Sequence, residues 1–108
     1  MQQLTRQDVL SHLSVHNETL EIRLPLPSTP LKTKQWVSQL ATLFCFQCSE
    51  GDWGADRYQV MLSASEGERE LRCILCIEWL CESIWLEPTG VQQNTETLAN
   101  YLHRSGNV

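Results

Sequence analysis

Basic residues are scarce in this sequence. Lysine and arginine together number 8 against 13 aspartates and glutamates, which gives the 108-residue chain a formal net charge of −5. Proteins that bind nucleic acids or anionic membranes use clustered cations to reach phosphates and acidic headgroups. The one close basic pair, Lys32 and Lys34, suits a solvated helix start. The charge balance therefore argues against nucleic-acid partners and against binding to a membrane surface.

Long apolar runs are also missing. No segment reaches the roughly 18 continuous apolar residues that span a bilayer. The start, residues 1–8, has no hydrophobic stretch of the kind that an export signal needs. We therefore expect a cytoplasmic protein, in which the 5 cysteines are reduced thiols. Their odd number also prevents complete pairing within one chain.

Catalytic motifs are absent from the sequence as well. It contains no glycine-rich phosphate loop and no nucleophile elbow. The histidines, His12, His16 and His103, stand apart from any serine, cysteine or acid in a nucleophile arrangement. We therefore expect a protein that is not an enzyme, and we assign no catalytic residue.

The sequence does have the composition of a folded protein, with 42% hydrophobic residues. Its length suits a single domain over residues 1–108. Residues 4–13 place apolar side chains at near-helical spacing, and Thr5 with Asp8 forms a capping-box signal, although a strand also fits this segment. Residues 19–26 alternate apolar and polar side chains, which predicts a half-buried strand.

A longer helix is predicted over residues 30–47. Thr29 suits the N-cap, and Pro30 fits the first helical position. The spacing of the apolar residues gives one broad stripe that faces a core. This stripe consists of Trp36, Val37, Leu40, Ala41, Leu43, Phe44 and Cys48.

Alternation and turn residues predict three more strands and a final helix. The strands hold Tyr58 to Ala64, residues 70–79 and residues 82–87, and residues 65–69 form a turn between the first two. A helix over 95–104 follows. Short links between consecutive strands favour an antiparallel meander. We therefore predict an α+β fold with an antiparallel sheet of about four strands in the order β-α-β-β-β-α. The main helix packs on one face of the sheet. An additional helix at the N-terminus is a possible extension of this order.

Two cysteine pairs have the spacing of a zinc site. Cys45 with Cys48, and Cys73 with Cys76, form two C-x2-C motifs, and zinc commonly takes four cysteine ligands in this pattern. However, residues three apart on a strand point to opposite faces, which separates Cys73 from Cys76. The first pair, at the end of the predicted helix, is able to converge. We favour reduced, buried cysteines and no cofactor, and keep zinc binding as the alternative.

A loop over residues 49–56 carries a tryptophan between glycines. Tryptophan is enriched at binding hot spots, so we select Trp53 as a contact residue with Asp52, Asp56 and Arg57 as its polar rim. Trp53 folding back to cover the core edge is the alternative. A calcium or magnesium site is a further alternative, which the small number of ligands disfavours.

The predicted strand 70–79 is apolar on both faces. Ile74 and Cys76 share one face with Trp85 of the next strand, and one long helix covers only the other face. The second face then needs a cover, either from the shorter helices or from another chain. This pattern motivates the hypothesis of a homodimer that forms through the second face of the sheet or through the tail helix.

Two segments together resemble a known family. They are residues 53–57, WGADR, and residues 80–87, LCESIWLE. The chain resembles a family of short bacterial cytosolic proteins that carry a domain of unknown function. The resemblance extends over nearly the whole chain and implies a bacterial origin and a stand-alone domain. It implies no activity.

These observations favour a small, acidic, non-enzymatic protein-interaction module. Its negative charge suits a basic protein partner, because complementary charge speeds association. A zinc-binding module is one alternative. An inhibitor-like or immunity-like protein that masks a basic enzyme is another, supported by size and charge but by no motif.

Overall fold

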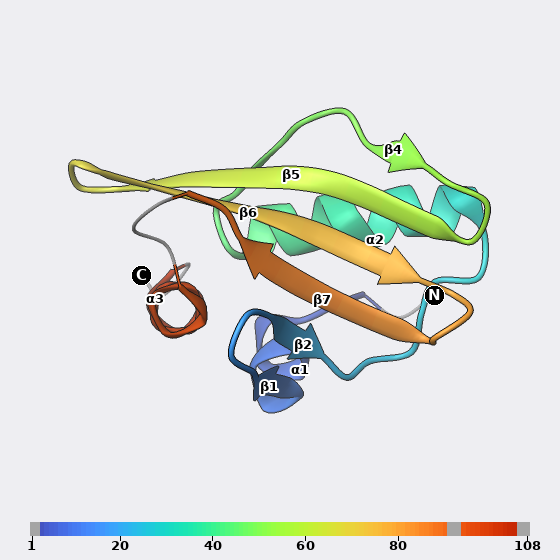
Figure 1. Ribbon diagram of the computed structural model, residues 1–108, viewed down its shortest axis with the longest axis horizontal. Helices are drawn as coiled ribbons and strands as arrows, with labels where there is room; N and C mark the ends of the chain where they lie inside the picture. Colours follow the sequence, from blue (N-terminus) through green and yellow to red (C-terminus); the bar gives the residue numbers. More distant parts are fainter. Residues whose placement is uncertain (1–2, 91–93, 106–108) are drawn as a thin grey trace.

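The computed structural model describes residues 3–90 and 94–105 of the chain. Figure 1 shows a twisted sheet with helices packed against it. None of the helices in this part of the chain is long and apolar enough to cross a membrane. The elements are, in order, α1 (Arg6–Ser11), β1 (Leu13–Val15), β2 (Leu20–Ile22), α2 (Pro30–Leu43), β3 (Gln47–Cys48), β4 (Asp52–Trp53), β5 (Arg57–Glu66), β6 (Arg69–Glu78), β7 (Ser83–Pro88) and α3 (Thr95–Arg104).

The strands form one antiparallel sheet in the order β1-β2-β7-β6-β5-β3, and β4 also pairs with β5. The α+β class and the meander of β5, β6 and β7 are confirmed. The predicted strand number, about four, is too low, because the described residues contain 7 strands. The additional strands β1, β3 and β4 have 3, 2 and 2 residues. Such short strands do not show the alternation that identifies a strand in a sequence.

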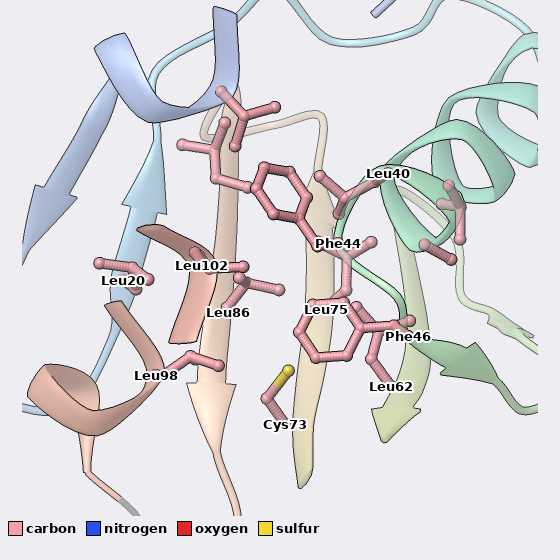
Figure 2. Close-up of a cluster of buried hydrophobic side chains, with 14 of the residues drawn as sticks. Leu20, Leu40, Phe44, Phe46, Leu62, Cys73, Leu75, Leu86, Leu98 and Leu102 are labelled. Atoms are coloured by element: carbon pink, nitrogen blue, oxygen red, sulfur yellow. The ribbon is translucent and has the colours of Figure 1, made fainter. Parts of the chain in front are cut away.

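Within the described residues, the helices all pack on one face of the sheet. Val9 of α1, Leu40 of α2 and Leu98 of α3 belong to the same buried cluster. This cluster lies between the helices and the strands, as Figure 2 shows for ten labelled side chains. The placement of the main helix on one face is therefore confirmed. The sheet supplies Leu20, Ile22, Tyr58, Val60, Leu62, Ala64, Leu71, Cys73, Leu75, Ile77, Ile84 and Leu86 to this core.

Side-chain caps start each of these helices. The Thr5 hydroxyl accepts a hydrogen bond from the Asp8 backbone, and the Asp8 carboxylate accepts one from the Thr5 backbone, so the predicted capping box is present. Thr29 caps α2, with Pro30 at the first helical position as expected. Asn94 caps α3. Each cap satisfies a backbone N–H that has no partner inside its helix.

The helix α2 ends earlier than the sequence predicts. The expected end was residue 47, but the last helical residue is Leu43, and Phe44 is the C-cap. Cys45 then adopts a left-handed backbone with φ of 58°. This residue turns the chain so that Phe46 is buried in the core. No glycine or proline marks the helix end, so the sequence pattern continues past it.

Two hydrogen bonds, one buried and one partly buried, attach α3 to the rest of the fold. The Tyr101 hydroxyl donates to the Phe44 carbonyl oxygen at 2.7 Å, which satisfies a carbonyl at the end of α2. The Thr95 hydroxyl donates to the His16 carbonyl oxygen at 2.9 Å, between β1 and β2. The bounds predicted for α3 agree with the structure.

The other face of the sheet, which we call the open face, carries no helix in the described part of the chain. Figure 1 looks onto this face, with α2 behind β5 and β6. The register places Gln59, Cys76 and Trp85 side by side on it, and Met61 beside Ile74. The expected grouping of Ile74, Cys76 and Trp85 is therefore confirmed. The shorter helices α1 and α3 leave this face uncovered because they pack with α2.

Candidate functional site

An aromatic cluster lies where β4 meets β5 and the end of β6. The Trp53 ring packs against Tyr58, with centroids 4.5 Å apart, and stacks on Trp79 at 6.0 Å and 15°. Tyr58 is buried, and Trp79 packs against the core. Trp53 nevertheless keeps 46% of its surface exposed. It therefore covers the edge of the core and also presents a large apolar surface to solvent.

Backbone hydrogen bonds fix the position of this cluster. The Gly54 N–H donates to the Arg57 carbonyl oxygen at 2.7 Å, which closes the turn between β4 and β5. The Trp79 N–H donates to the Asp56 carbonyl oxygen at 2.9 Å. The Trp79 indole N–H donates to the Pro27 carbonyl oxygen at 2.8 Å. These hydrogen bonds restrict the backbone next to Trp53 and the position of the Trp79 ring.

Gly51 makes room for the Tyr58 ring. A Cβ atom at this position would lie 2.0 Å from the Tyr58 hydroxyl oxygen, far inside van der Waals contact. The glycine is therefore needed for the close approach of the chain to Tyr58 just before β4.

A cavity of about 220 Å³ opens beside the two indole rings. Trp53, Asp56, Arg57 and Trp79 line it, and together with this cavity they make up what we call the Trp53 end. The remaining lining residues are Ser28, Thr29, Pro30, Gly54 and Ala55. Asp52, also selected from the sequence, does not line the cavity. It lies on β4 opposite Gln59 of β5.

The structure adds Trp79 to the candidate site. From the sequence it is one of several apolar residues on the core face of a strand, and that assignment agrees with its packing against the core. Its position after Glu78, the last residue of β6, was the available signal, because a residue at a strand end borders both core and solvent. Pairing with Trp53 depends on the short strand β4, which the sequence did not reveal.

Acidic groups surround the Trp53 end. Asp52 and Asp56 are exposed, and Asp52 lies close enough to Tyr58 to influence its ionisation. Burial raises the pKa of Tyr58, and the nearby Cys48 thiolate and Asp52 carboxylate raise this pKa further. Tyr58 is therefore a neutral packing residue around neutral pH. The charged groups that an approaching molecule meets are the exposed carboxylates and the Arg57 guanidinium.

Comparison of the chain with family models, with curated proteins and with solved structures found no match.

A second cavity, of about 430 Å³, lies between α1, the segment before α2, and α2 itself. Leu4, Leu24, Leu26 and Trp36 form its apolar part. The sequence did not mark it as a site. Its walls come from three separate segments, and no motif links them.

The cysteine pairs do not meet in this fold. Cys73 is buried in the core, while Cys76 lies on the open face, where its sulfur accepts a hydrogen bond from the Gln59 amide. The expected separation of these two sulfurs is confirmed. The helical turn that would let Cys45 and Cys48 converge is absent, because both lie beyond the end of α2. The expected burial is confirmed for Cys73 and Cys76 but is wrong for Cys45 and Cys48, which are exposed. No group of three or more histidine, cysteine, aspartate or glutamate side chains that could hold a metal ion occurs among the described residues.

Proposed function

We propose that this protein is a non-enzymatic protein-interaction module that binds a basic partner through the Trp53 end. The proposal rests on one observation, the combination of fixed position and solvent exposure at Trp53. Its ring is held by Tyr58 and Trp79, yet 46% of its surface is exposed. The reducing cytoplasm is its proposed location, which the free thiols of all described cysteines suit.

Rigid aromatic side chains are efficient contact residues. Binding usually costs about 0.5–1.5 kcal/mol for each flexible side chain that it immobilises. The Trp53 ring is already confined by its two aromatic neighbours, so little of this cost remains. A partner that covers the ring gains most of the free energy of apolar burial. Tryptophan residues of this kind dominate many protein interfaces.

Two further exposed apolar residues are chain neighbours of residues that line the cavity. Leu31 follows the cavity residue Pro30 and is 66% exposed, while Leu80 follows Trp79 and is 78% exposed. With Trp53, they account for most of the large apolar side chains that the described residues expose. Large exposed apolar side chains at a cavity residue and at the chain neighbours of two others support an interaction site at this end of the molecule.

The charge of the molecule indicates the chemistry of the partner. The chain carries a formal net charge of −5, and Asp52 and Asp56 stand next to Trp53. A partner with lysine or arginine around one large apolar side chain is complementary in both respects. The apolar side chain enters the cavity, and the cations pair with the carboxylates at the rim.

Selection from a random-peptide display library tests this proposal. We expect the protein to select peptides that combine several basic residues with one large apolar residue. Replacing Trp53 with alanine should weaken their binding by at least about tenfold, which corresponds to 1.4 kcal/mol. Because the rim contacts are ionic, added salt should weaken binding further.

Val15→Ala is the matched control, because Val15 is also an exposed apolar residue, 58% exposed, but lies on β1. It should bind the selected peptides as the parent protein does. Peptides that bind Trp53→Ala with unchanged affinity, or a selection that yields acidic peptides, would show that the Trp53 end is not the recognition surface.

A further inference from the structure

The open face has the composition of an interface core. Met61 on β5 is 41% exposed, and Ile74 on β6 and Trp85 on β7 are partly exposed. None of these side chains belongs to the buried cluster on the helix side or packs against it. Cys76 is buried on this face by its neighbours alone. A sheet with helices on one side thus leaves a continuous apolar centre on the other.

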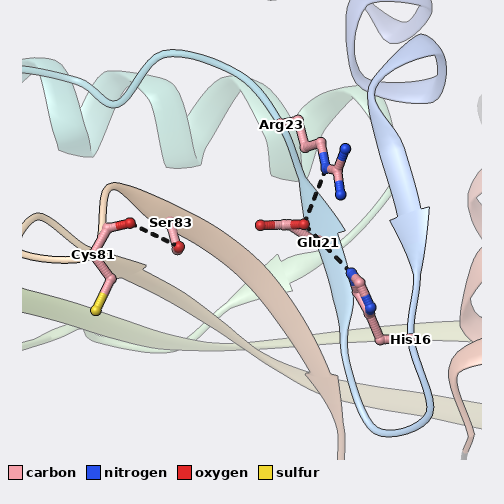
Figure 3. A network of polar contacts seen from close by, with 5 residues as sticks. All are labelled: His16, Glu21, Arg23, Cys81 and Ser83. Carbon is pink, nitrogen blue, oxygen red and sulfur yellow. Dashed lines mark hydrogen bonds and ion pairs between the residues drawn. The ribbon is translucent and has the colours of Figure 1, made fainter.

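Charges of both signs surround this centre. Figure 3 shows one part of the rim, where Glu21 lies between Arg23 and His16, with distances of 3.1 and 3.4 Å. Arg72 pairs with Glu70 at 3.1 Å, and Arg57 lies opposite Glu78 in the register. The charged residues on this face are Arg23, Arg57, Arg72, Asp52, Glu21, Glu70, Glu78 and Glu87. Three arginines against five carboxylates leave the open face with a net charge of −2, which is smaller than the −5 of the whole chain.

We propose that the open face binds a second copy of this chain and forms a symmetric dimer. In a two-fold dimer the same patch faces itself, so residues near the axis meet their own copies. Uncharged residues are required there, and Met61, Ile74 and Trp85 meet this requirement. Away from the axis, a rim with both signs pairs its arginines with glutamates of the second copy. A strongly basic partner would find only a small excess of negative charge on this face.

The size of the open face suits a dimer of moderate affinity. Strands β5 and β6 each have 10 residues, a length of about 33 Å at about 3.3 Å per residue. With β7 and β2 beside them at a spacing of about 4.8 Å, the face covers roughly 500 Å². A standard interface buries about 800 Å² on each partner. We therefore expect a dimer that forms at micromolar concentration.

This proposal does not depend on the Trp53 end. Trp53 pairs with Tyr58 of β5, and Tyr58 faces the helices, so the Trp53 ring lies on the helix side of the sheet. Met61 belongs to the opposite side. Arg57 borders both surfaces, but Trp53 and Met61, on which the two proposals rest, face opposite sides, so a dimer presents the Trp53 ring twice.

Sedimentation equilibrium of the full chain over a range of concentrations tests the dimer. We expect the mass to rise with concentration from 12.4 kDa towards twice that value. Met61→Glu places like charges near the two-fold axis and should raise the dissociation constant at least about tenfold. Because Met61 is 41% exposed, this change leaves the monomer fold intact, which circular dichroism verifies.

Arg72→Glu provides a second, milder test at an exposed rim position. It makes the face more strongly negative and should weaken the dimer in a way that added salt partly restores. Trp53→Ala is the control and should leave the measured mass unchanged. The proposal is overturned by a monomer at every concentration, by a dimer that persists unchanged in Met61→Glu, or by a dimer that only Trp53→Ala dissociates.

Discussion

At the scale of single residues, Cys81 shows how one carboxylate controls an exposed thiol. The Cys81 sulfhydryl donates a hydrogen bond to Glu78 Oε1 at 3.5 Å. This hydrogen bond and the negative charge of Glu78 raise the pKa of Cys81 above its ordinary value of 9.0. The thiolate is the reactive form of cysteine, so Cys81 should react slowly with alkylating reagents despite its exposure.

We predict that Glu78→Gln speeds the alkylation of Cys81 by about two- to fivefold near neutral pH. The amide carries no charge, so the pKa of Cys81 falls and its thiolate fraction rises, an effect that the lower nucleophilicity of the thiolate only partly offsets. Mass spectrometry of peptides from a timed maleimide reaction measures the rate at each cysteine. Exposed Cys45 is the internal control, and its rate should not change. Equal acceleration at both cysteines would point to a general loosening of the fold.

Residue types in the sequence indicated part of the candidate site. Trp53, Asp56 and Arg57 lie within one short segment, and the structure places all three around one cavity. Trp79 is 26 positions away from Trp53 in the chain. Its contribution depends on strand pairing and on the hydrogen bond to Pro27, and single-residue chemistry carries no information about either.

At the scale of elements, the strand β4 depends on the two glycines on either side of it. Gly51 lies against the Tyr58 ring, and Gly54 lies in the turn that joins β4 to β5. The space around them differs. A Cβ atom at Gly51 would meet the Tyr58 ring at 2.0–2.4 Å, whereas at Gly54 the nearest atom is 3.7 Å away.

We predict that Gly51→Ala destabilises the protein by about 1–3 kcal/mol, because Tyr58 must shift within a packed core. The shift should also displace Trp53 and weaken peptide binding. Gly54→Ala is the matched control, for which we expect a loss below about 1 kcal/mol, because the added methyl group makes only ordinary contacts. Urea denaturation of both variants measures the difference. Equal stability of the two variants would show that Tyr58 has more freedom than its packing indicates.

Elements with strong local signals were predictable, and those without them were not. The capping box of α1, the Thr29–Pro30 start of α2 and the bounds of α3 follow from side chains next to each other in the chain. The strands β3 and β4 form because β5 offers an unpaired edge to the segment after α2. This edge exists only in the folded molecule. Tertiary pairing therefore decides the elements that local pattern leaves undefined.

At the scale of the whole molecule, one-sided packing separates the core from the two surfaces that we propose for binding. The helices and one face of the sheet enclose the buried cluster, while the open face and the Trp53 end stay available. The alternation of β6 indicated two apolar faces, and that part of the architecture was predictable. The direction that the chain takes after each strand determines which face of the sheet the short helices cover. The spacing of apolar residues in the sequence does not show this direction.

The enclosed core also determines how stability responds to alkaline pH. Burial raises the pKa of Cys73 to about 12, and nearby Cys48 and Cys76 add to the shift. An unfolded cysteine ionises at about pH 9. Between these pH values the unfolded chain releases a proton that the native protein keeps, so the free energy of unfolding decreases as pH rises. Below about pH 9 both states are protonated, and the contribution is fully present.

We predict that Cys73→Ala reduces this alkaline loss of stability. The substitution leaves a small cavity, which costs a similar free energy at every pH, so the slope above about pH 9 is the informative quantity. Denaturant titrations at a series of pH values measure this slope. Tyr58 and Tyr101, whose pKa values are also raised by burial, remain in both proteins and cancel in the comparison. Cys81→Ala removes an exposed thiol and should keep most of the parent slope. If Cys73→Ala and the parent protein lose stability in parallel above about pH 9, the Cys73 thiol is not the group that ionises on unfolding.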